Sequence, residues 1–323
     1  MAEDKQPSSV RPSIGGQAVL EGVMMRGPES WSVACRKLDR SIAVERHPLP
    51  KLAERHTWLK RPLARGCMVL GESLVLGTRA LKISALHAME EEEGQEPGLS
   101  DKQLGTTLIV ALVVFSAVFI ALPVIGTRLI ERLAGAHALA QHPLLFNVVE
   151  VALRLGLFVG YLLFISRFED IRRVFQYHGA EHKTIYAYEN GDALDPATIN
   201  RKYSTLHVRC GTNFLFIVLF LTVIAHFAVD LVVGGPLLPR IGVRILAIPL
   251  LAGLSYELIR LASRNEDSLL FKAAMLPGLA LQKITTKPPT PDQIEVAIAA
   301  MQAVAPGKKP ASGGPGAPEA PVS

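Results

Sequence analysis

Four long apolar stretches divide the chain, and each has the length and composition of a membrane-spanning helix. The clearest covers residues 105–126, with no charged side chain in 22 positions. At about 1.5 Å per residue, this length is enough to cross a hydrocarbon core of about 30 Å. The others cover residues 144–166, 212–235 and 241–262. We therefore expect a mainly α-helical, polytopic membrane protein with about four transmembrane helices.

Two of the predicted spans contain pairs of polar residues. The second span holds Glu150 and Arg154, and the third holds His226 and Asp230. Residues four apart lie on one face of a helix, so an ion pair or hydrogen bond within the helix explains each pair. A path for protons or ions through the membrane is the alternative.

The spacing of apolar residues differs between two segments that precede the first predicted span. Residues 13–49 hold short apolar runs at 17–25, 31–36 and 41–46, separated by turn residues, which predict the strands of a small β-meander. Residues 61–89 instead have apolar positions at helical spacing, with polar side chains between them. This predicts an amphipathic helix that lies in the membrane interface or packs against the bundle, and a segment that re-enters the membrane is the alternative.

These patterns divide the chain into segments. The polar N-terminus and the Pro-, Gly- and Ala-rich C-terminus predict disorder, and a run of glutamates predicts a linker before the first span. The expected segments are a disordered N-terminus (1–12), a cytoplasmic β-meander (13–49), an amphipathic or interfacial helix (50–89), an acidic linker (90–104), a four-helix membrane domain (105–287) with a cytoplasmic loop (167–211), and a C-terminal tail (288–323) that is disordered from about residue 305.

The distribution of Lys and Arg predicts the orientation in the membrane. The first loop contains only Arg128 and Arg132, whereas the second loop contains seven Lys and Arg residues. The segments before the first span and after the fourth are also basic. Basic loops stay inside the cell, so both termini are expected on the cytoplasmic side of the inner (plasma) membrane. Only 20% of the residues are charged and the mean hydropathy is +0.29, which excludes an ordinary soluble domain.

The second loop contains the sharpest chemical motif, which runs from His178 through Glu181 to His182. The pattern H-x-x-E-H places two histidines on one helical face, where both imidazoles reach one divalent ion with Glu181 beside them. The same pattern marks inverted zincin metalloproteases, in which the glutamate is the general base. Gly179 lowers the helix propensity inside the motif, and two solvated histidines on a polar helix are the alternative.

Further candidate residues are expected on the same side of the membrane. Glu257 lies toward the cytoplasmic end of the fourth span, where a carboxylate is costly unless it is paired or binds a metal. An ion pair with Arg260 or Arg264 is the alternative. Cys210 is a soft ligand or a nucleophile, with a buried small residue as the alternative. The remaining candidates are Glu21, Arg26 and Glu72 before the first span, and His207 and Arg209 beside Cys210.

Four long motifs occur in order along the chain. They are GGQAVLEGVMMRGP near the N-terminus, YHGAEHKTIYAYENG in the second loop, HVRCGTNF after it and SYELIRLA in the last span. Over residues 13–287 the chain resembles the YqhQ-like family of bacterial membrane proteins, which carry a domain of unknown function (DUF1385). The family is sometimes labelled a predicted metal-dependent enzyme. The resemblance therefore implies His178, Glu181, His182 and Glu257 as candidate site residues, and it implies no particular substrate.

We expect a membrane-bound, metal-dependent hydrolase at the cytoplasmic membrane face. His178, His182 and Glu257 are the expected ligands of a divalent metal, with zinc favoured, and Glu181 is the expected general base. The expected partners are the lipid bilayer and a lipid or protein substrate, and no nucleic acid. A non-enzymatic membrane scaffold or assembly factor is the alternative. A small ion- or proton-coupled transporter that uses the intramembrane pairs is a third interpretation.

Overall fold

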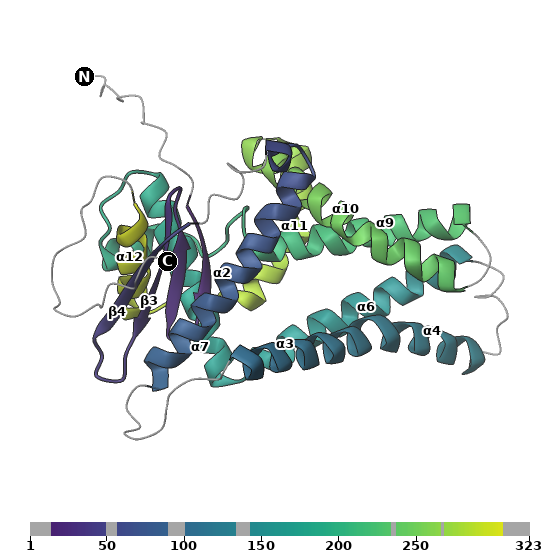
Figure 1. The fold of residues 1–323 in the computed structure, drawn as a ribbon, viewed down its shortest axis with the longest axis horizontal. Helices are drawn as coiled ribbons and strands as arrows, with labels where there is room; N and C mark the ends of the chain where they lie inside the picture. The colour runs from purple at the N-terminus through teal and green to yellow at the C-terminus, as the bar shows by residue number, and fades with distance from the viewer. Residues whose placement is uncertain are drawn as a thin grey trace.

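The computed structural model describes residues 14–49, 57–89, 101–133, 143–233, 237–265 and 268–305 (Figure 1). The predictions for residues 1–12, for most of the acidic linker and for disorder at the C-terminus lie outside these ranges. The described part is mainly helical, with a small antiparallel sheet near the N-terminus. This confirms the predicted combination of many helices with one short meander.

The sheet is an antiparallel meander of four strands in sequence order. The strands are β1 (Gly15–Val19), β2 (Gly22–Arg26), β3 (Ser30–Arg36) and β4 (Ile42–Pro48). A tight turn at residues 20–21 divides the apolar run that the sequence predicts as one strand, and Glu21 in this turn has a φ of 49°. Few residues other than glycine adopt this left-handed conformation, so the turn is a strained point that other contacts must hold.

Helices cover both faces of the sheet. Those on one side are α7 (Glu169–Glu189), α8 (Pro196–Lys202) and α12 (Pro291–Val304), and the helix on the other side is α2 (Ala64–Met89). Val23 and Met25 belong to the core with α7, α8 and α12, whereas Met24 belongs to the core with α2. This alternation is the period of a β-strand. We call the sheet together with α7, α8 and α12 the head.

Much of the head folds from segments for which the sequence predicts a loop or a tail. Helices α7 and α8 occupy the predicted loop at 167–211, and α12 occupies the start of the predicted tail. Helix α12 begins with a capping box of Thr290 and Gln293 and buries Ile294 and Met301 completely. A helix of this length is marginal by itself, so packing against the sheet, α7 and α8 is what stabilises it.

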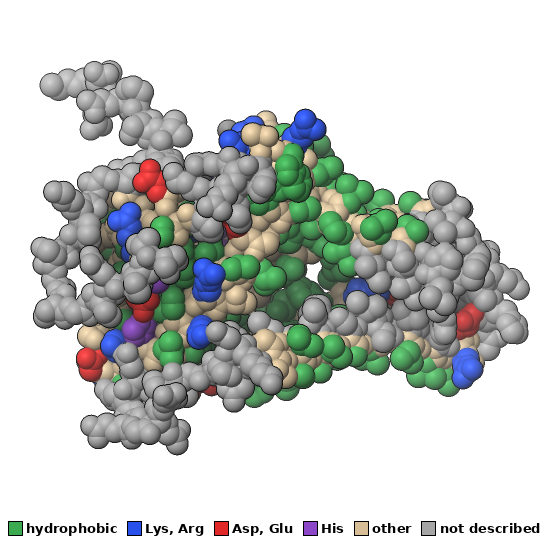
Figure 2. Space-filling view, in the orientation of Figure 1, with side chains coloured by type: hydrophobic (Ala, Val, Ile, Leu, Met, Phe, Trp, Pro, Cys, Tyr) green, Lys and Arg blue, Asp and Glu red, His purple; other side chains and the backbone are tan. Residues whose placement is uncertain are grey.

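A second group of helices, most of them long and apolar, forms what we call the stem. They are α3 (Asp101–Ser116), the π-helical turn η2 (Ala117–Ala121), α4 (Leu122–Leu133), α6 (Pro143–Ile165), α9 (Gly211–Val233) and α10 (Leu237–Arg264). Among the described residues, two unbroken stretches are long and apolar enough to cross a membrane: Val148–Ile165 and Leu246–Arg264. The stretch Gly211–Ala225 is apolar but shorter. Figure 2 shows apolar side chains over much of the visible surface of the stem.

An ion pair lies inside the stem, as the spacing of Glu150 and Arg154 predicts. The two side chains pair within α6, and Nε of Arg154 also donates a hydrogen bond to the carbonyl oxygen of Phe119 at 3.0 Å. Because Phe119 belongs to η2, the pair ties α6 to the π-helical turn. The side chains of His226 and Asp230 lie outside the described residues.

Helix α2 joins the head to the stem. It follows a short 3-10 helix, η1 (Thr57–Lys60), and its residues Leu76 and Ala80 pack on the sheet. Near its start, Gly66 lies so close to Gly253 of α10 that an added Cβ would come within 2.9 Å of the Gly253 Cα. Helix α2 therefore packs against α10 of the bundle, and its position relative to a membrane stays a prediction. Helix α11 (Leu269–Thr285) follows α10, packs against α9 and leads to α12 in the head.

Candidate metal centre

Two histidines of α7 meet one cysteine at the start of α9. The ring centroids of His178 and His182 are 4.5 Å apart. His178, His182 and Cys210 each offer one ligand atom, and the three atoms lie within 4.8 Å of one another. Donors that share one tetrahedral ion at about 2.0–2.3 Å are about 3.3–3.8 Å apart, so small side-chain shifts bring these three atoms onto one ion. The structure thus pairs the two histidines of the motif and adds Cys210 as a third donor.

Backbone carbonyl groups orient both histidines. Nδ1 of His178 lies 2.9 Å from the carbonyl oxygen of Thr285, and Nδ1 of His182 lies 2.5 Å from that of Thr205. A carbonyl oxygen can only accept a hydrogen bond, so each Nδ1 carries a proton and each Nε2 presents a lone pair. Metal-binding histidines have this arrangement, because it fixes both the tautomer and the direction of the ring.

The sulfur of Cys210 has three polar neighbours. It lies 3.2 Å from Nε2 of His178 and 2.9 Å from Oγ1 of Thr212, and the backbone N–H of Thr212 donates to it at 3.5 Å. The thiol is buried and can pass its proton directly to His178. The thiolate is the form of cysteine that binds metals or attacks a substrate, so both roles remain open to this residue.

A buried glutamine holds the segment that carries Thr205 and Cys210. Gln282 of α11 has no exposed surface. Its Oε1 accepts from the backbone N–H of His207 and its Nε2 donates to the carbonyl oxygen of His207, both at 2.8 Å. The amide therefore pairs with the backbone as a neighbouring strand would. Without it, the backbone N–H of His207 would lose its partner, at about 1–3 kcal/mol. The carbonyl oxygen of His207 would keep two longer hydrogen bonds, from the N–H of Cys210 at 3.3 Å and from Nδ2 of Asn213 at 3.4 Å.

The His207 side chain lies beside the three donors but is not one of them. Its ring centroid is 5.4 Å from that of His182 and 4.7 Å from that of Tyr186. Nδ1 of His207 accepts a hydrogen bond from the backbone N–H of Arg209 at 3.3 Å, which places the proton on Nε2. Burial lowers the pKa of His207 well below its usual value, and the neighbouring His182 and Arg209 lower it further. The ring is therefore neutral.

Glu181 is buried on the side of α7 that meets β1. Its side chain lies against Gly16, where an added Cβ would come within 2.8 Å of the carboxylate. In the part of the chain that the structure describes, its Oε2 has no hydrogen-bond partner. Burial raises the pKa of Glu181 to about 7, although the nearby His178 acts in the opposite direction. A carboxylate with such a pKa can take up and release a proton near neutral pH.

Gly179 allows another chain segment to pass close to the motif. An added Cβ on Gly179 would lie 2.2 Å from the carbonyl oxygen of Lys287. The N–H of Lys287 donates to the carbonyl oxygen of Phe175 at 2.8 Å, so the segment after α11 is fixed against this face of α7. The glycine that weakens the helix is thus the residue that lets the carbonyl of Thr285 reach His178.

Several other candidates from the sequence form ion pairs instead. Glu257 of α10 binds Nε of Arg65 at 3.1 Å and also its Nη2, so its partner is on α2 and is neither Arg260 nor Arg264. It is not a member of the three-donor group. Its position makes Glu257 part of the contact between α2 and α10. The remaining pairs are Arg26 with Glu72, between β2 and α2, and Arg209 with Glu189, at the end of α7.

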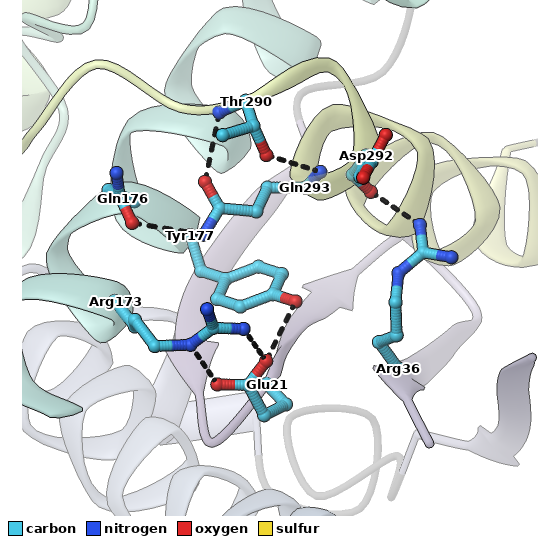
Figure 3. A network of polar contacts seen from close by, with 8 residues as sticks. All are labelled: Glu21, Arg36, Arg173, Gln176, Tyr177, Thr290, Asp292 and Gln293. Atoms are coloured by element: carbon cyan, nitrogen blue, oxygen red, sulfur yellow. Dashed lines mark hydrogen bonds and ion pairs between the residues drawn. The ribbon is translucent and has the colours of Figure 1, made fainter. Parts of the chain in front are cut away.

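Glu21 connects the turn between β1 and β2 to α7 (Figure 3). Arg173 donates to its carboxylate through Nε at 2.6 Å and through Nη2, and the hydroxyl of Tyr177 donates at 3.3 Å. These contacts hold the left-handed turn in place. They also fix β1 against α7, where Gly16 meets Glu181. Glu21 is therefore a structural link to the site and not one of its donors.

Sequence reasoning misses the groups that orient the donors. Thr205 and Thr285 act through backbone carbonyls, which any residue type would supply, so no side-chain signal marks them. Gln282 leaves a weak signal, because it is a lone uncharged polar residue between the apolar run LPGLAL and Lys283. Its role depends on contact with a segment 75 residues away.

The donor set fits zinc. Imidazole nitrogen and thiolate sulfur suit zinc better than magnesium or calcium, which prefer oxygen ligands. Three protein donors leave one position of a tetrahedron open, as catalytic zinc sites do. The buried carboxylate of Glu181 adds an acid–base group on the same helix.

Comparison with known proteins identifies the family. A family model described as "Protein of unknown function (DUF1385)" matches residues 61–306. The chain is 34% identical over 299 residues to "Uncharacterized protein YqhQ" of Bacillus subtilis (strain 168), an alignment that covers 90% of this chain and 91% of that protein. No solved structure matches the chain. The protein belongs to the YqhQ-like DUF1385 family.

Proposed function

We propose that the protein is a membrane-bound hydrolase that uses a zinc ion held by His178, His182 and Cys210. The observation that carries the proposal is the pair of hydrogen bonds from Nδ1 to backbone carbonyls, which leaves both Nε2 atoms available beside the sulfur. Helical spacing alone does not explain these bonds, because the two carbonyls come from separate segments. When bound, zinc would lower the pKa of a water molecule to about 7 and polarise the bond to be cleaved.

Glu181 moves the proton in this proposal. Its carboxylate accepts a proton from the attacking water and returns it to the leaving group, which completes the hydrolysis. The side chain is buried, so bulk water does not compete for this proton. The second oxygen, which lacks a partner among the described residues, is available for a water molecule or substrate group.

One observation favours a second candidate, a cysteine hydrolase that needs no metal. Sγ of Cys210 and Nε2 of His178 are 3.2 Å apart, and the carbonyl of Thr285 orients the imidazole from its other side. A nucleophile, a base and a group that orients the base are the three parts of such a site. In this alternative, His178 removes the thiol proton and the sulfur attacks the substrate.

Metal content and thiol reactivity distinguish the two candidates. Protein purified without chelators and with zinc supplied is expected to hold about one zinc per chain, as measured by elemental analysis. Modification of Cys210 by iodoacetamide is then measured by peptide mass spectrometry. Cys210 should react only after a chelator has removed the metal. Metal-free protein whose Cys210 reacts at once would favour the cysteine hydrolase. Metal-free protein with an unreactive Cys210 would favour the scaffold.

The proposal also includes four membrane crossings, with the head in the cytoplasm. The crossings are the continuous helix of α3, η2 and α4, together with α6, α9 and α10. Two observations support them: α6 and α10 contain stretches that are long and apolar enough, and large apolar side chains are exposed along the stem, such as Ile109 at 65% and Leu246 at 80%. The Lys and Arg distribution supports the orientation.

Labelling of introduced cysteines tests this orientation. Leu133 at the end of α4 and Leu38 in the turn between β3 and β4 are 79% and 61% exposed, so both are accessible in the folded protein. A membrane-impermeant maleimide added to intact protoplasts is expected to label Leu133→Cys but to label Leu38→Cys only after permeabilisation. The unsubstituted protein gives the background from its own cysteines. The reverse pattern would place the head outside the cell and contradict the proposal.

A further inference from the structure

Helix α11 has two opposite faces, and the buried face helps to build the centre. Gly278, Gln282 and Thr285 are all buried and are spaced by four and three residues, so they share one face. They contact three parts of the site in turn. Gly278 lies against the first turn of α9, Gln282 holds the segment that leads to Cys210, and Thr285 orients His178.

The other face of α11 is apolar and exposed. Leu269, Ala273, Leu276 and Ala280 repeat with the same spacing, and the first and third of these side chains have 84% and 62% of their surface exposed. At 3.6 residues per turn, Leu276 points about 200° away from Gly278. Leaving a leucine side chain in water instead of burying it costs about 1.5–3 kcal/mol. Such a face therefore requires an apolar environment.

The lipid of the cytoplasmic leaflet is the environment that the surroundings of α11 favour. The helix follows α10 directly and packs against α9, so its apolar face continues the apolar surface of the stem. Lys272 and Lys283 are exposed at its two ends, where ammonium groups can reach lipid phosphates. The apolar stripe from Leu269 to Ala280 is about 18 Å long, too short to cross a core of about 30 Å.

We propose that α11 lies in the plane of the membrane, with its apolar face among the acyl chains of the cytoplasmic leaflet. Amphipathic helices of this kind enter the headgroup–acyl boundary by about 5–10 Å. The opposite face of the same helix contacts His178 and the segment that leads to Cys210, and a helix is about 10 Å wide. The proposed metal centre is then at the level of the lipid headgroups. This part of the inference rests on the proposed function. The position of α11 itself does not depend on the metal.

Quenching of tryptophan fluorescence by brominated lipid tests this position. Leu276→Trp places the probe in the middle of the apolar face, and Leu38→Trp is a control of equal exposure in the head. Both are made with Trp58→Phe, which leaves buried Trp31 as a constant background. In vesicles whose phosphatidylglycerol carries bromine near the top of the acyl chains, emission from Leu276→Trp should fall by at least about half. Emission from Leu38→Trp should not change.

The outcomes separate this inference from the proposed function, because zinc content is measured on the same samples. Quenching at position 276 without bound zinc would retain the membrane position and remove the metal centre. Bound zinc without quenching would retain the centre and overturn the membrane position. Equal quenching of both probes would also overturn it, because a probe in the head should not reach the acyl chains.

Discussion

Replacing His182 with alanine is expected to remove nearly all of the bound zinc. Structural zinc sites bind the ion with a free energy of about 10–16 kcal/mol. His182 is one of three donors, so its loss is expected to weaken zinc binding by about one third of this, roughly 4 kcal/mol. By affinity arithmetic, that is about a 1000-fold weaker Kd. Elemental analysis after dialysis against a weak chelator measures the loss, and His178→Ala should behave in the same way.

Two matched variants make this experiment specific. His47→Gln changes a histidine that stacks on Trp31 at a ring distance of 4.6 Å, far along the chain from the donors, and it should keep the full zinc content. Glu181→Gln should also keep the zinc, because Glu181 is proposed as a base and not as a ligand. If His182→Ala retained one zinc per chain while folded, the assigned donor set would be wrong.

Gly179→Ala is expected to destabilise the head strongly, although alanine is the better helix former. The new Cβ would lie 2.2 Å from the carbonyl oxygen of Lys287, and a backbone group cannot rotate away as a side chain can. Overpacking of this kind costs about 3 kcal/mol, against a gain in helix propensity of about 1 kcal/mol. The thermal midpoint of the detergent-solubilised protein should therefore fall.

Gly71→Ala in α2 is the control for this substitution. Among the described residues, nothing beyond the adjoining part of α2 lies within 4 Å of an added Cβ at position 71. Only the gain in helix propensity then remains, and the midpoint should rise or stay the same. Gly179→Ala should also weaken zinc binding, because moving Lys287 moves the carbonyl of Thr285 away from His178. An unchanged midpoint and zinc content in Gly179→Ala would show that the close approach is not needed.

The elements that the sequence predicts well are those with a local signal. Val23, Met24 and Met25 lie in a run of apolar residues between turn residues, and they form a strand. The spacing of His178 and His182 predicts a shared helical face, and the rings are adjacent. The apolar stretches likewise predict long helices, because their length and composition are read directly from the chain.

The elements that the sequence misses depend on distant contacts. Helix α12 is short and rich in alanine, and it is buried by the sheet together with α7 and α8. Glu257 is expected to bind metal or a neighbouring arginine, yet its partner is Arg65, which is 192 residues away. A polar residue in an apolar segment shows that some partner is needed, and only the fold shows which one.

The contact between the sheet and α12 has a consequence for biosynthesis. The hydroxyl of Ser32 in β3 donates to the carbonyl oxygen of Ala300, 268 residues later, and Val23 and Met25 share a core with α12. At about 5–20 residues per second, the ribosome reaches α12 roughly 10–50 s after β3. The stem helices are synthesised during this interval. The strands made first must therefore wait, with the part of their apolar face that α12 covers still exposed, until α12 leaves the ribosome. A chaperone that shields residues 14–49 during translation would protect this nascent chain from aggregation.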